Sequence, residues 1–205
     1  MQLPLIGDPA PFFACRTTKG PKSLDDYRGG WLVLFSHPAD FTPVCTSEFV
    51  AFAEAAPRFA ARGCELLGLS VDSLFSHFAW VRSIEKRFGV RIPFPLIEDP
   101  SLAIASAYGM VHPNATSSAT VRGCFVIDPS GTIRMSCFYP MSTGRSVAEI
   151  YRTLVALQTA DAEGCSTPEA WQPGEPVIDL AQVDADDGRD VAEWMYNLRP
   201  LERTG

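Results

Sequence analysis

Residues 31–45 of the chain read WLVLFSHPADFTPVC. Their first part, Trp31–Phe35, is an uninterrupted apolar run, which is typical of a strand buried on both faces of a sheet. A polar loop with prolines follows, and the spacing of apolar residues after it predicts a helix from Cys45 to Ala61. A buried strand that leads through a loop into a helix is a building unit of layered α/β folds.

The alternation of strands and helices continues along the chain. Leu66–Val71 is a second apolar run, and Ser73 can cap the helix that follows it. Further predicted elements are an edge or strand-start segment at Phe94–Ile97, a helix Leu102–Tyr108 capped by Asp99, a hairpin formed by Cys124–Asp128 and Ile133–Phe138, and a long helix from Ser146. We therefore expect an α/β sandwich with a mixed central sheet.

The composition changes in the last quarter of the chain. Glycine and proline turn formers gather between Gly164 and Pro176, and the segment 179–190 is acidic. We expect two domains, a main one at 1–161 and a C-terminal extension domain at 162–205.

The bulk composition is that of a globular protein, with 46% apolar and 20% charged residues in 205. The net charge of -7 disfavours nucleic acid and anionic membranes as partners. The first residues lack the features of a signal peptide, and no apolar stretch has the length of a membrane span. We expect a cytoplasmic protein.

Six cysteines are spread along the chain, at positions 15, 45, 64, 124, 137 and 165. No two of them form a C-x-x-C motif, and the chain has three histidines, so the spacing indicates no metal site, and we expect no cofactor. Cys64, Cys124 and Cys137 lie in or beside apolar strands, where reduced structural cysteines are common.

Cys45 differs from the others because it falls in the first turn of a predicted helix. Free backbone N–H groups and the positive end of the helix dipole lie there, and both favour a thiolate. Pro43 suits the helix start because its missing N–H would have no partner there. The hydroxyl of Thr42 can turn toward the sulfur or a bound substrate, and Pro38 can shield the pocket from water.

A thiolate in such a place suits the reduction of a peroxide. The sulfur attacks one oxygen while the other takes up negative charge, so hydrogen-bond donors have to lie near the leaving oxygen. The N–H groups of the first turn and the hydroxyl of Thr42 supply some donors, and a guanidinium would supply more.

The spacing Pro-x-x-x-Thr-x-x-Cys, unbroken from Pro38 to Cys45, closely resembles the motif of the peroxiredoxins (AhpC/TSA family). Its flanks resemble the one-cysteine, peroxiredoxin-6-like branch of that family. The likeness covers nearly all the chain and includes the stretches Val71–Ser73, Arg122–Pro129, Tyr139–Arg145 and Ser166–Trp171. It implies a thioredoxin-like three-layer sandwich with a small C-terminal extension domain.

The resemblance also implies the roles of four site residues. Cys45 would be the peroxidatic cysteine of an antioxidant enzyme, oxidised to a sulfenic acid by hydrogen peroxide or an organic hydroperoxide. Thr42 and Arg122 would orient the peroxide and stabilise the thiolate. Pro38 would shield the cysteine.

Three further residues and the partners are implied in the same way. His37 would lie close by in the pocket, and Glu48 and Arg145 would complete a polar network that holds Arg122. An external thiol would reduce the sulfenic acid, although Cys15 or Cys165 stays open as a resolving cysteine. Members of this branch form homodimers and sometimes rings of dimers, so we expect at least a homodimer.

Other functions stay open at this point. A thiol–disulfide oxidoreductase of the same fold needs a second cysteine where this chain has Thr42, and a cysteine hydrolase lacks an evident base and orienting partner. A holdase or redox sensor is the non-enzymatic alternative. The stretch Tyr27–Trp31 contains no serine to match the phospholipase serine of some relatives, so we expect no lipase activity. The preferred peroxide and the physiological reductant are not specified by the sequence.

Overall fold

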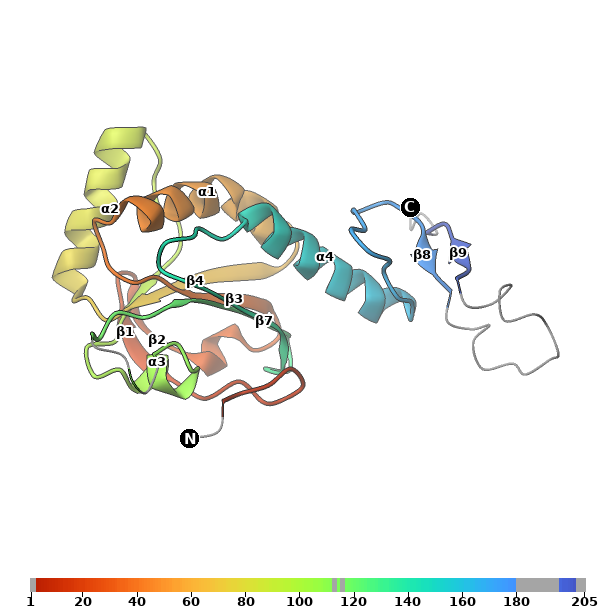
Figure 1. Cartoon of the computed structure of the whole chain (residues 1–205), viewed down its shortest axis with the longest axis horizontal. Coiled ribbons are helices and arrows are strands. Elements are labelled where there is room, and N and C mark those ends of the chain that lie inside the picture. Colours follow the sequence, from red (N-terminus) through yellow and green to blue (C-terminus); the bar gives the residue numbers. More distant parts are fainter. Residues whose placement is uncertain (1–2, 112–113, 115–116, 180–195, 202–205) are drawn as a thin grey trace. The chain divides into compact units, whose positions relative to one another are not determined.

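The computed structural model describes residues 3–111, 114, 117–179 and 196–201, and Figure 1 shows its elements. The chain divides into two compact units, Met1–Val147 and Ala148–Gly205. The expected acidic segment 179–190 lies outside the described residues except for Asp179. The domain boundary after residue 161 stays a prediction.

The first unit is built on a seven-stranded mixed sheet with the strand order β2-β1-β5-β4-β3-β6-β7. Its strands are β1 (Ala14–Thr17), β2 (Gly20–Ser23), β3 (Trp31–Ser36), β4 (Cys64–Ser70), β5 (Leu96–Glu98), β6 (Arg122–Ile127) and β7 (Ile133–Tyr139). The central strands β3, β4 and β5 are parallel, whereas β6 runs antiparallel to β3 and to β7. The mixed sheet predicted from the sequence is therefore confirmed.

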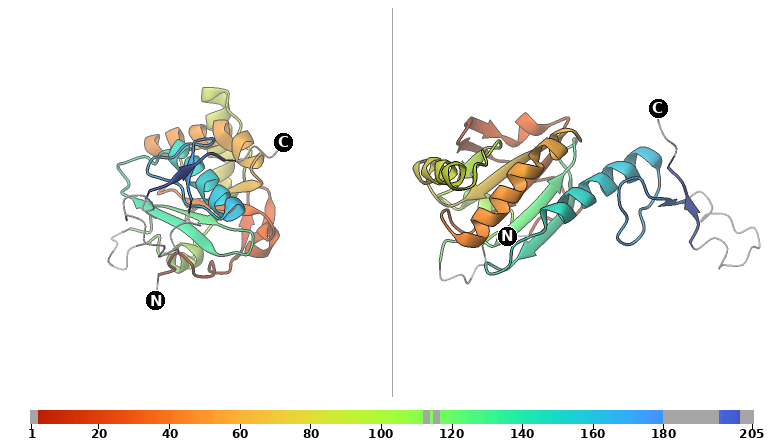
Figure 2. Two further views of the ribbon diagram at one scale, coloured as in Figure 1. Left: turned by 90° about the vertical axis from the view of Figure 1, so that its right-hand side faces the viewer. Right: turned by 90° about the horizontal axis from the view of Figure 1, so that it is seen from above.

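Helices cover both faces of this sheet. α1 (Pro43–Ala60) and α2 (Leu74–Phe88) lie on one face, and the short α3 (Ala103–Ala107) lies on the other with the 3-10 helix η1 (Leu24–Tyr27) (Figures 1 and 2). The alternation of side chains along β3 explains the two layers. Leu34 belongs to a buried cluster with Tyr108, whereas Phe35 stacks on Phe52 of α1 with 4.1 Å between ring centroids.

The helices begin within two residues of the predicted starts, since α1 begins at Pro43 rather than Cys45 and α3 at Ala103 rather than Leu102. Pro43 is the first residue of α1, and the side chain of Ser73 accepts a hydrogen bond from the N–H of Ser76 at the start of α2. Asp99 accepts from the N–H groups of Ala103 and Ala105 and so caps α3 with its carboxylate.

Two features of the sheet differ from the expectation. The hairpin β1–β2 was not predicted, because its strands are only four residues long and alternate poorly. The strand at Phe94–Ile97 begins after its prolines, as expected, but it is not at an edge. β1 pairs with it through Thr17 and Ile97, so β5 lies between β1 and β4.

The second unit contains α4 (Val147–Glu163) except for its first residue, β8 (Val177–Ile178) and β9 (Leu198–Arg199). β8 and β9 form an antiparallel pair. The unit has its own small buried cluster, made by Val155, Ala156, Cys165, Trp171 and Val177. Among the described residues, no helix combines the length and the apolar character that a membrane span requires.

Candidate active site

Cys45 lies at the start of α1, directly after the loop that leaves β3. It is the third residue of the helix, and Thr42 is the N-cap residue. The first turn of a helix leaves backbone N–H groups unbonded and carries the positive end of the dipole. The side chain is completely buried, so its sulfur is held in a fixed environment of protein atoms.

Arg122 contacts the sulfur from the neighbouring strand. β6 pairs with β3, so the first residue of β6 reaches the end of the sheet from which the loop to α1 leaves. Arg122 Nη1 donates to Cys45 Sγ at 3.3 Å and to Glu48 Oε2 at 2.8 Å. Its Nε and Nη2 donate to the carbonyl of Met141 at 3.2 and 2.7 Å. The guanidinium fork is therefore fixed on three sides.

Glu48 joins Arg122 to a second buried arginine. Arg145 donates to the carboxylate of Glu48 from its backbone N–H, its Nε and its Nη2, at 2.7 to 2.9 Å, and its Nη1 donates to the carbonyl of Gly123. Burial alone raises the pKa of Glu48, but the hydrogen bonds and charge of Arg145, with the charge of Arg122, bring that pKa below its usual value. The carboxylate stays ionised and holds both cations.

Thr42 and Pro38 belong to the segment that leads from β3 into α1. Pro38 is buried, and Thr42 is partly buried. The hydroxyl of Thr42 donates to the carbonyl of Ala39 at 2.8 Å, which leaves the lone pairs of its oxygen to accept another hydrogen bond. Phe41, next to it, is 57% exposed and has a φ of 59°, an unusual value for a bulky residue.

His37 lies behind the loop in a buried chain of polar side chains. Its Nε2 is 2.8 Å from one oxygen of Asp40, whose other oxygen is 2.8 Å from Nδ1 of His77. Burial raises the pKa of Asp40, but the hydrogen bonds from the two histidines outweigh this and hold the pKa well below its usual range. Burial lowers the pKa of His37 despite the nearby carboxylate, so its ring is neutral and its buried Nδ1 has no hydrogen-bond partner.

The same three side chains offer atoms that could ligate a metal, since these atoms lie within 4.8 Å of one another. They are, however, already hydrogen-bonded to each other, and Nε2 of His77 is 3.1 Å from the carbonyl of Ile97. This chain of hydrogen bonds holds the loop before Cys45 in place.

Three of the other five cysteines, Cys15, Cys64 and Cys165, have raised thiol pKa values. All six belong to the described residues and none is in a disulfide. Burial and the charge of Asp99 raise the pKa of Cys15 to about 11, and burial raises that of Cys64 to about 12. Burial also raises the pKa of Cys165. Few of these thiols ionise near neutral pH, so they are poor nucleophiles.

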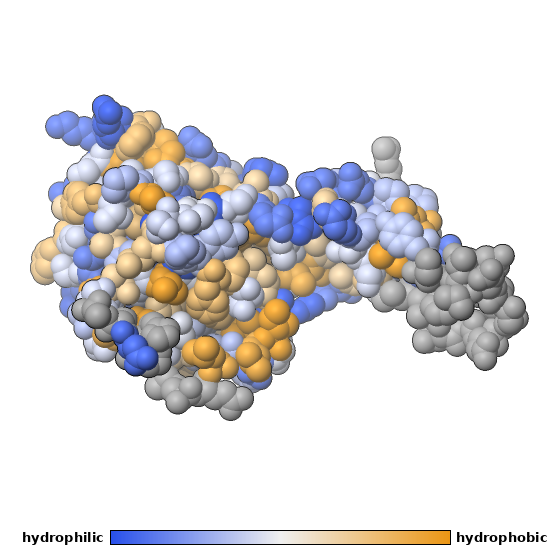
Figure 3. Space-filling view, viewed as in Figure 1, coloured by the Kyte–Doolittle hydropathy of each residue, from blue (hydrophilic) through white to orange (hydrophobic). Residues whose placement is uncertain are grey.

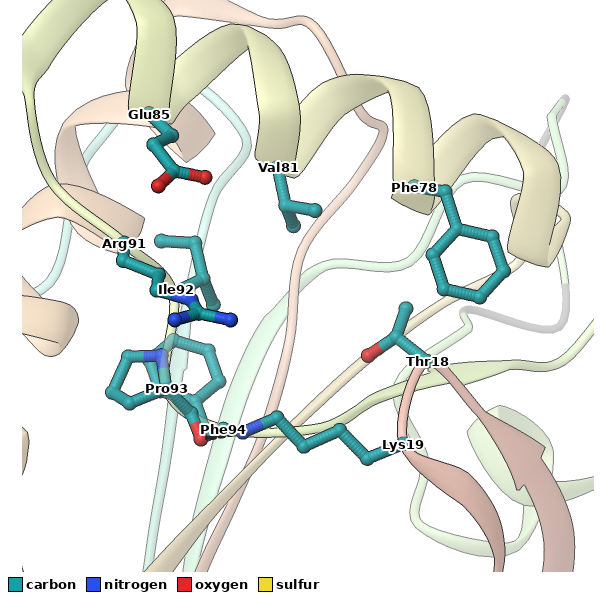
Figure 4. A pocket seen from close by; sticks show the side chains of 9 residues that line it. All are labelled: Thr18, Lys19, Phe78, Val81, Glu85, Arg91, Ile92, Pro93 and Phe94. Atoms are coloured by element: carbon teal, nitrogen blue, oxygen red, sulfur yellow. Dashed lines mark hydrogen bonds between the residues drawn. The ribbon is translucent and has the colours of Figure 1, made fainter.

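Figure 4 shows a cavity of about 440 Å³ that contains none of these groups. It is lined from α2, from the turn between β1 and β2 and from the segment before β5. Its cations are Lys19 and Arg91, and its acid is Glu85. It has no thiol, so it does not compete with Cys45 as a reaction centre.

The structure brings together four of the residues singled out from the sequence, Cys45, Arg122, Glu48 and Arg145, through direct bonds. His37 bonds Asp40 instead. The carbonyl of Met141, Asp40 and His77 were not singled out. Asp40 lies inside the motif and could have been singled out from it. Every residue has a backbone carbonyl, so the role of the Met141 carbonyl cannot be predicted from residue type.

Residues 6–136 match the model of the AhpC/TSA family, and residues 156–191 match the model described as the C-terminal domain of 1-Cys peroxiredoxin. A curated relative named Peroxiredoxin, from Aquifex aeolicus, is 54% identical over 174 residues, which are 84% of this chain and 78% of that protein.

Solved structures agree over most of the chain. A yeast mitochondrial 1-Cys peroxiredoxin superposes with a TM-score of 0.80 at 43% identity, covering 85% of either chain. A mutant of Peroxiredoxin 6 of Arenicola marina has a TM-score of 0.82 at 34% identity, covering 90% of this chain and 87% of its own. The thioredoxin-like fold expected from the resemblance is confirmed.

Proposed function

The chain belongs to the AhpC/TSA family of peroxiredoxins and is a thiol-dependent peroxidase, and we propose that Cys45 is the cysteine that attacks the peroxide. The hydrogen bond of 3.3 Å from Arg122 to its sulfur carries this assignment. A buried guanidinium at this distance favours the thiolate, and Cys45 lies on a helix N-terminus that does the same.

The reaction at this site is a two-electron transfer. The thiolate of Cys45 attacks one oxygen of the peroxide, the O–O bond breaks, and the other oxygen leaves as water or an alcohol after it takes up a proton. Cys45 becomes a sulfenic acid. Arg122 contacts the sulfur, and its guanidinium can stabilise the negative charge as it moves from the sulfur to the leaving oxygen.

The other site residues support this step. Thr42 accepts a hydrogen bond from the peroxide while its own hydroxyl donates to the carbonyl of Ala39, and buried Pro38 keeps water from the sulfur. Glu48 and Arg145 position Arg122 through their buried ion pairs. His37 contributes a neutral ring beside the pocket.

The sulfenic acid is reduced by an external thiol. The structure of the yeast 1-Cys peroxiredoxin is described as the basis of its thiol resolving mechanism via the glutathione and thioredoxin systems. We infer a reductant of the same kind here, a low-molecular-weight thiol or a dithiol protein. The raised pKa values of Cys15 and Cys165 disfavour both as resolving thiols.

The protein acts as a homodimer or a ring of dimers in the cytoplasm. Figure 3 shows apolar patches on the surface of the first unit. Exposed large apolar side chains of this unit include Leu5, Ile6, Phe12, Phe138 and Met141, and contiguous exposed apolar surface often marks an interface.

Residues 1–161 and 162–205 are the two domains of the protein, and the second family match begins at residue 156, close to this boundary.

Stopped-flow consumption of hydrogen peroxide and an alkyl hydroperoxide by prereduced protein tests the assignment, with wild type beside Cys45→Ser. We expect one peroxide consumed per chain, followed by a mass increase of one oxygen, and no fast phase in the variant. Cys64→Ser is the matched control, since it removes another buried thiol and leaves the fast phase intact. A fast phase that survives in Cys45→Ser would refute the assignment.

A further inference from the structure

Two cysteines that the peroxidase mechanism does not use face each other across the sheet. Cys124 of β6 and Cys137 of β7 are direct partners in the antiparallel register. The pair Arg122–Tyr139 lies two positions away in the same register, beyond Gly123–Phe138. Side chains alternate along a strand, so the cysteine pair and Arg122 lie on one face of the sheet.

A direct antiparallel pair has the spacing that a disulfide needs. Opposed residues have Cα atoms about 4.5 or 5.5 Å apart, depending on which type of pair they form. Disulfides span Cα separations of about 4.4 to 6.8 Å. Both kinds of pair fall within this range, so the Cα spacing of the observed register permits a disulfide.

The two thiols have unlike surroundings. Cys124 is completely buried, whereas Cys137 is partly exposed on the outermost strand of the sheet. Hydrogen bonding with Cys124 and the charge of Arg145 lower the pKa of Cys137, whereas hydrogen bonding with Cys137 and burial raise the pKa of Cys124. Cys137 is therefore the nucleophile of the pair, and Cys124 is its partner.

We propose that Cys124 and Cys137 form a second redox site, a dithiol that peroxide converts into a disulfide between β6 and β7 without the participation of Cys45. The thiolate of Cys137 attacks a peroxide oxygen, the O–O bond breaks, and the leaving oxygen takes a proton and departs as water or an alcohol. The sulfur of Cys124 then attacks the sulfenic sulfur of Cys137. The S–O bond breaks, and the hydroxyl leaves as water with the proton of Cys124.

The disulfide stores two oxidising equivalents in a reversible form, because a paired sulfur no longer climbs to the sulfinic acid. The partly exposed sulfur of Cys137 is the one that an external thiol can attack, which restores the dithiol. Peroxide thus changes the oxidation state of a dithiol on the strand that carries Arg122, and this change is independent of the turnover of Cys45.

The test uses full-length Cys45→Ser, in which peroxide cannot react at the peroxidatic position. The protein is treated with excess hydrogen peroxide, free thiols are alkylated, and the chain is digested with trypsin without reduction. Cleavage after Arg122, Arg134 and Arg145 places Cys124 in peptide 123–134 and Cys137 in peptide 135–145. We expect these two peptides to be joined with the loss of two hydrogens, and to separate after reduction.

Two controls show whether the disulfide is specific to Cys124 and Cys137. Cys15 and Cys64, whose pKa values are raised to about 11 and 12, should stay alkylated in the same sample. In the double variant Cys45→Ser, Cys124→Val, which places an apolar residue of good strand propensity at position 124, the linked pair should vanish and Cys137 should gain oxygen instead. The proposal is overturned if both peptides of Cys45→Ser remain fully alkylated, or if they carry added oxygen and no link.

Discussion

Arg122 and Cys45, 77 residues apart in the chain, meet with Nη1 of the guanidinium 3.3 Å from the sulfur. The same nitrogen donates to Glu48, and the other two donate to the carbonyl of Met141. Every nitrogen of the fork is thus bonded before any substrate arrives. A preorganised donor of this kind need not reorient while charge moves from the sulfur to the leaving oxygen.

Replacing Arg122 with lysine should lower kcat/KM for peroxide by roughly 100-fold or more, because an ammonium keeps the charge but cannot span sulfur, carboxylate and carbonyl at once. Stopped-flow kinetics measure this effect. Arg134→Lys, a partly exposed arginine of the next strand, serves as the control and should keep the wild-type rate. An unchanged rate in Arg122→Lys would rule out the geometric role of the fork.

Thr42→Val should slow peroxide reduction by roughly 10- to 100-fold, since it keeps the shape of the side chain and removes the oxygen that receives the peroxide O–H. Thr42→Ser should retain most of the activity, because its hydroxyl can also bond to Ala39. Equal rates in the valine and serine variants would show that the hydroxyl takes no part.

Glu48→Gln should destabilise the protein by about 3–5 kcal/mol, because it leaves Arg122 and Arg145 buried without their carboxylate. Urea unfolding measures the loss. Glu54→Gln, an exposed position on the same helix, should change stability by less than about 0.5 kcal/mol. If the two variants were equally stable, the buried network would not hold the site together.

Stability should fall as the pH drops below about 6.5, the pKa of an ordinary histidine. Burial depresses the pKa of His37 in the folded state, so the unfolded chain binds a proton there first. The stability that comes from neutral His37 is full above that pH and is lost below it, at up to about 1.4 kcal/mol per pH unit. Asp40 and Glu48, whose folded pKa values are also depressed, add a loss below about pH 4.

The variant His37→Gln checks the origin of this slope, because an amide can donate to Asp40 but does not titrate. Urea unfolding between pH 5 and 7, a range about the ordinary pKa of histidine, should show a slope smaller by up to one proton in the variant. A variant with the full wild-type slope would place the titration elsewhere.

Cys45 should overoxidise when peroxide is in excess and thiol is scarce. A sulfenic acid without a resolving partner reacts with more peroxide and climbs to the sulfinic and sulfonic acids. Intact mass should then show two and three added oxygens per chain, suppressed by an added thiol. A disulfide that includes Cys45 as the sole product would mean that the chain resolves itself.

By itself the sequence determined the local structure. The apolar run Trp31–Phe35 is typical of a strand buried on both faces of a sheet. Pro43 begins the helix because it lacks the N–H group that the first turn of a helix leaves unpaired. Cys45 follows two residues later, so its position at the helix start depends on neighbours in the chain. The hairpin β6–β7 was likewise evident from the turn at Pro129–Gly131.

The tertiary structure alone decided which distant groups meet. Arg122, Glu48 and Arg145 converge because β6 lies beside β3 and Glu48 of α1 accepts hydrogen bonds from both arginines, which no local spacing encodes. The pairing of Cys124 with Cys137 depends on a register shift between Val126 and Ile127. If the register of Ile127 with Ile133 continued unshifted, Cys124 would oppose Ser136. One extra residue in a strand thus sets two thiols face to face, because register in a sheet is a property of the paired strands rather than of either one.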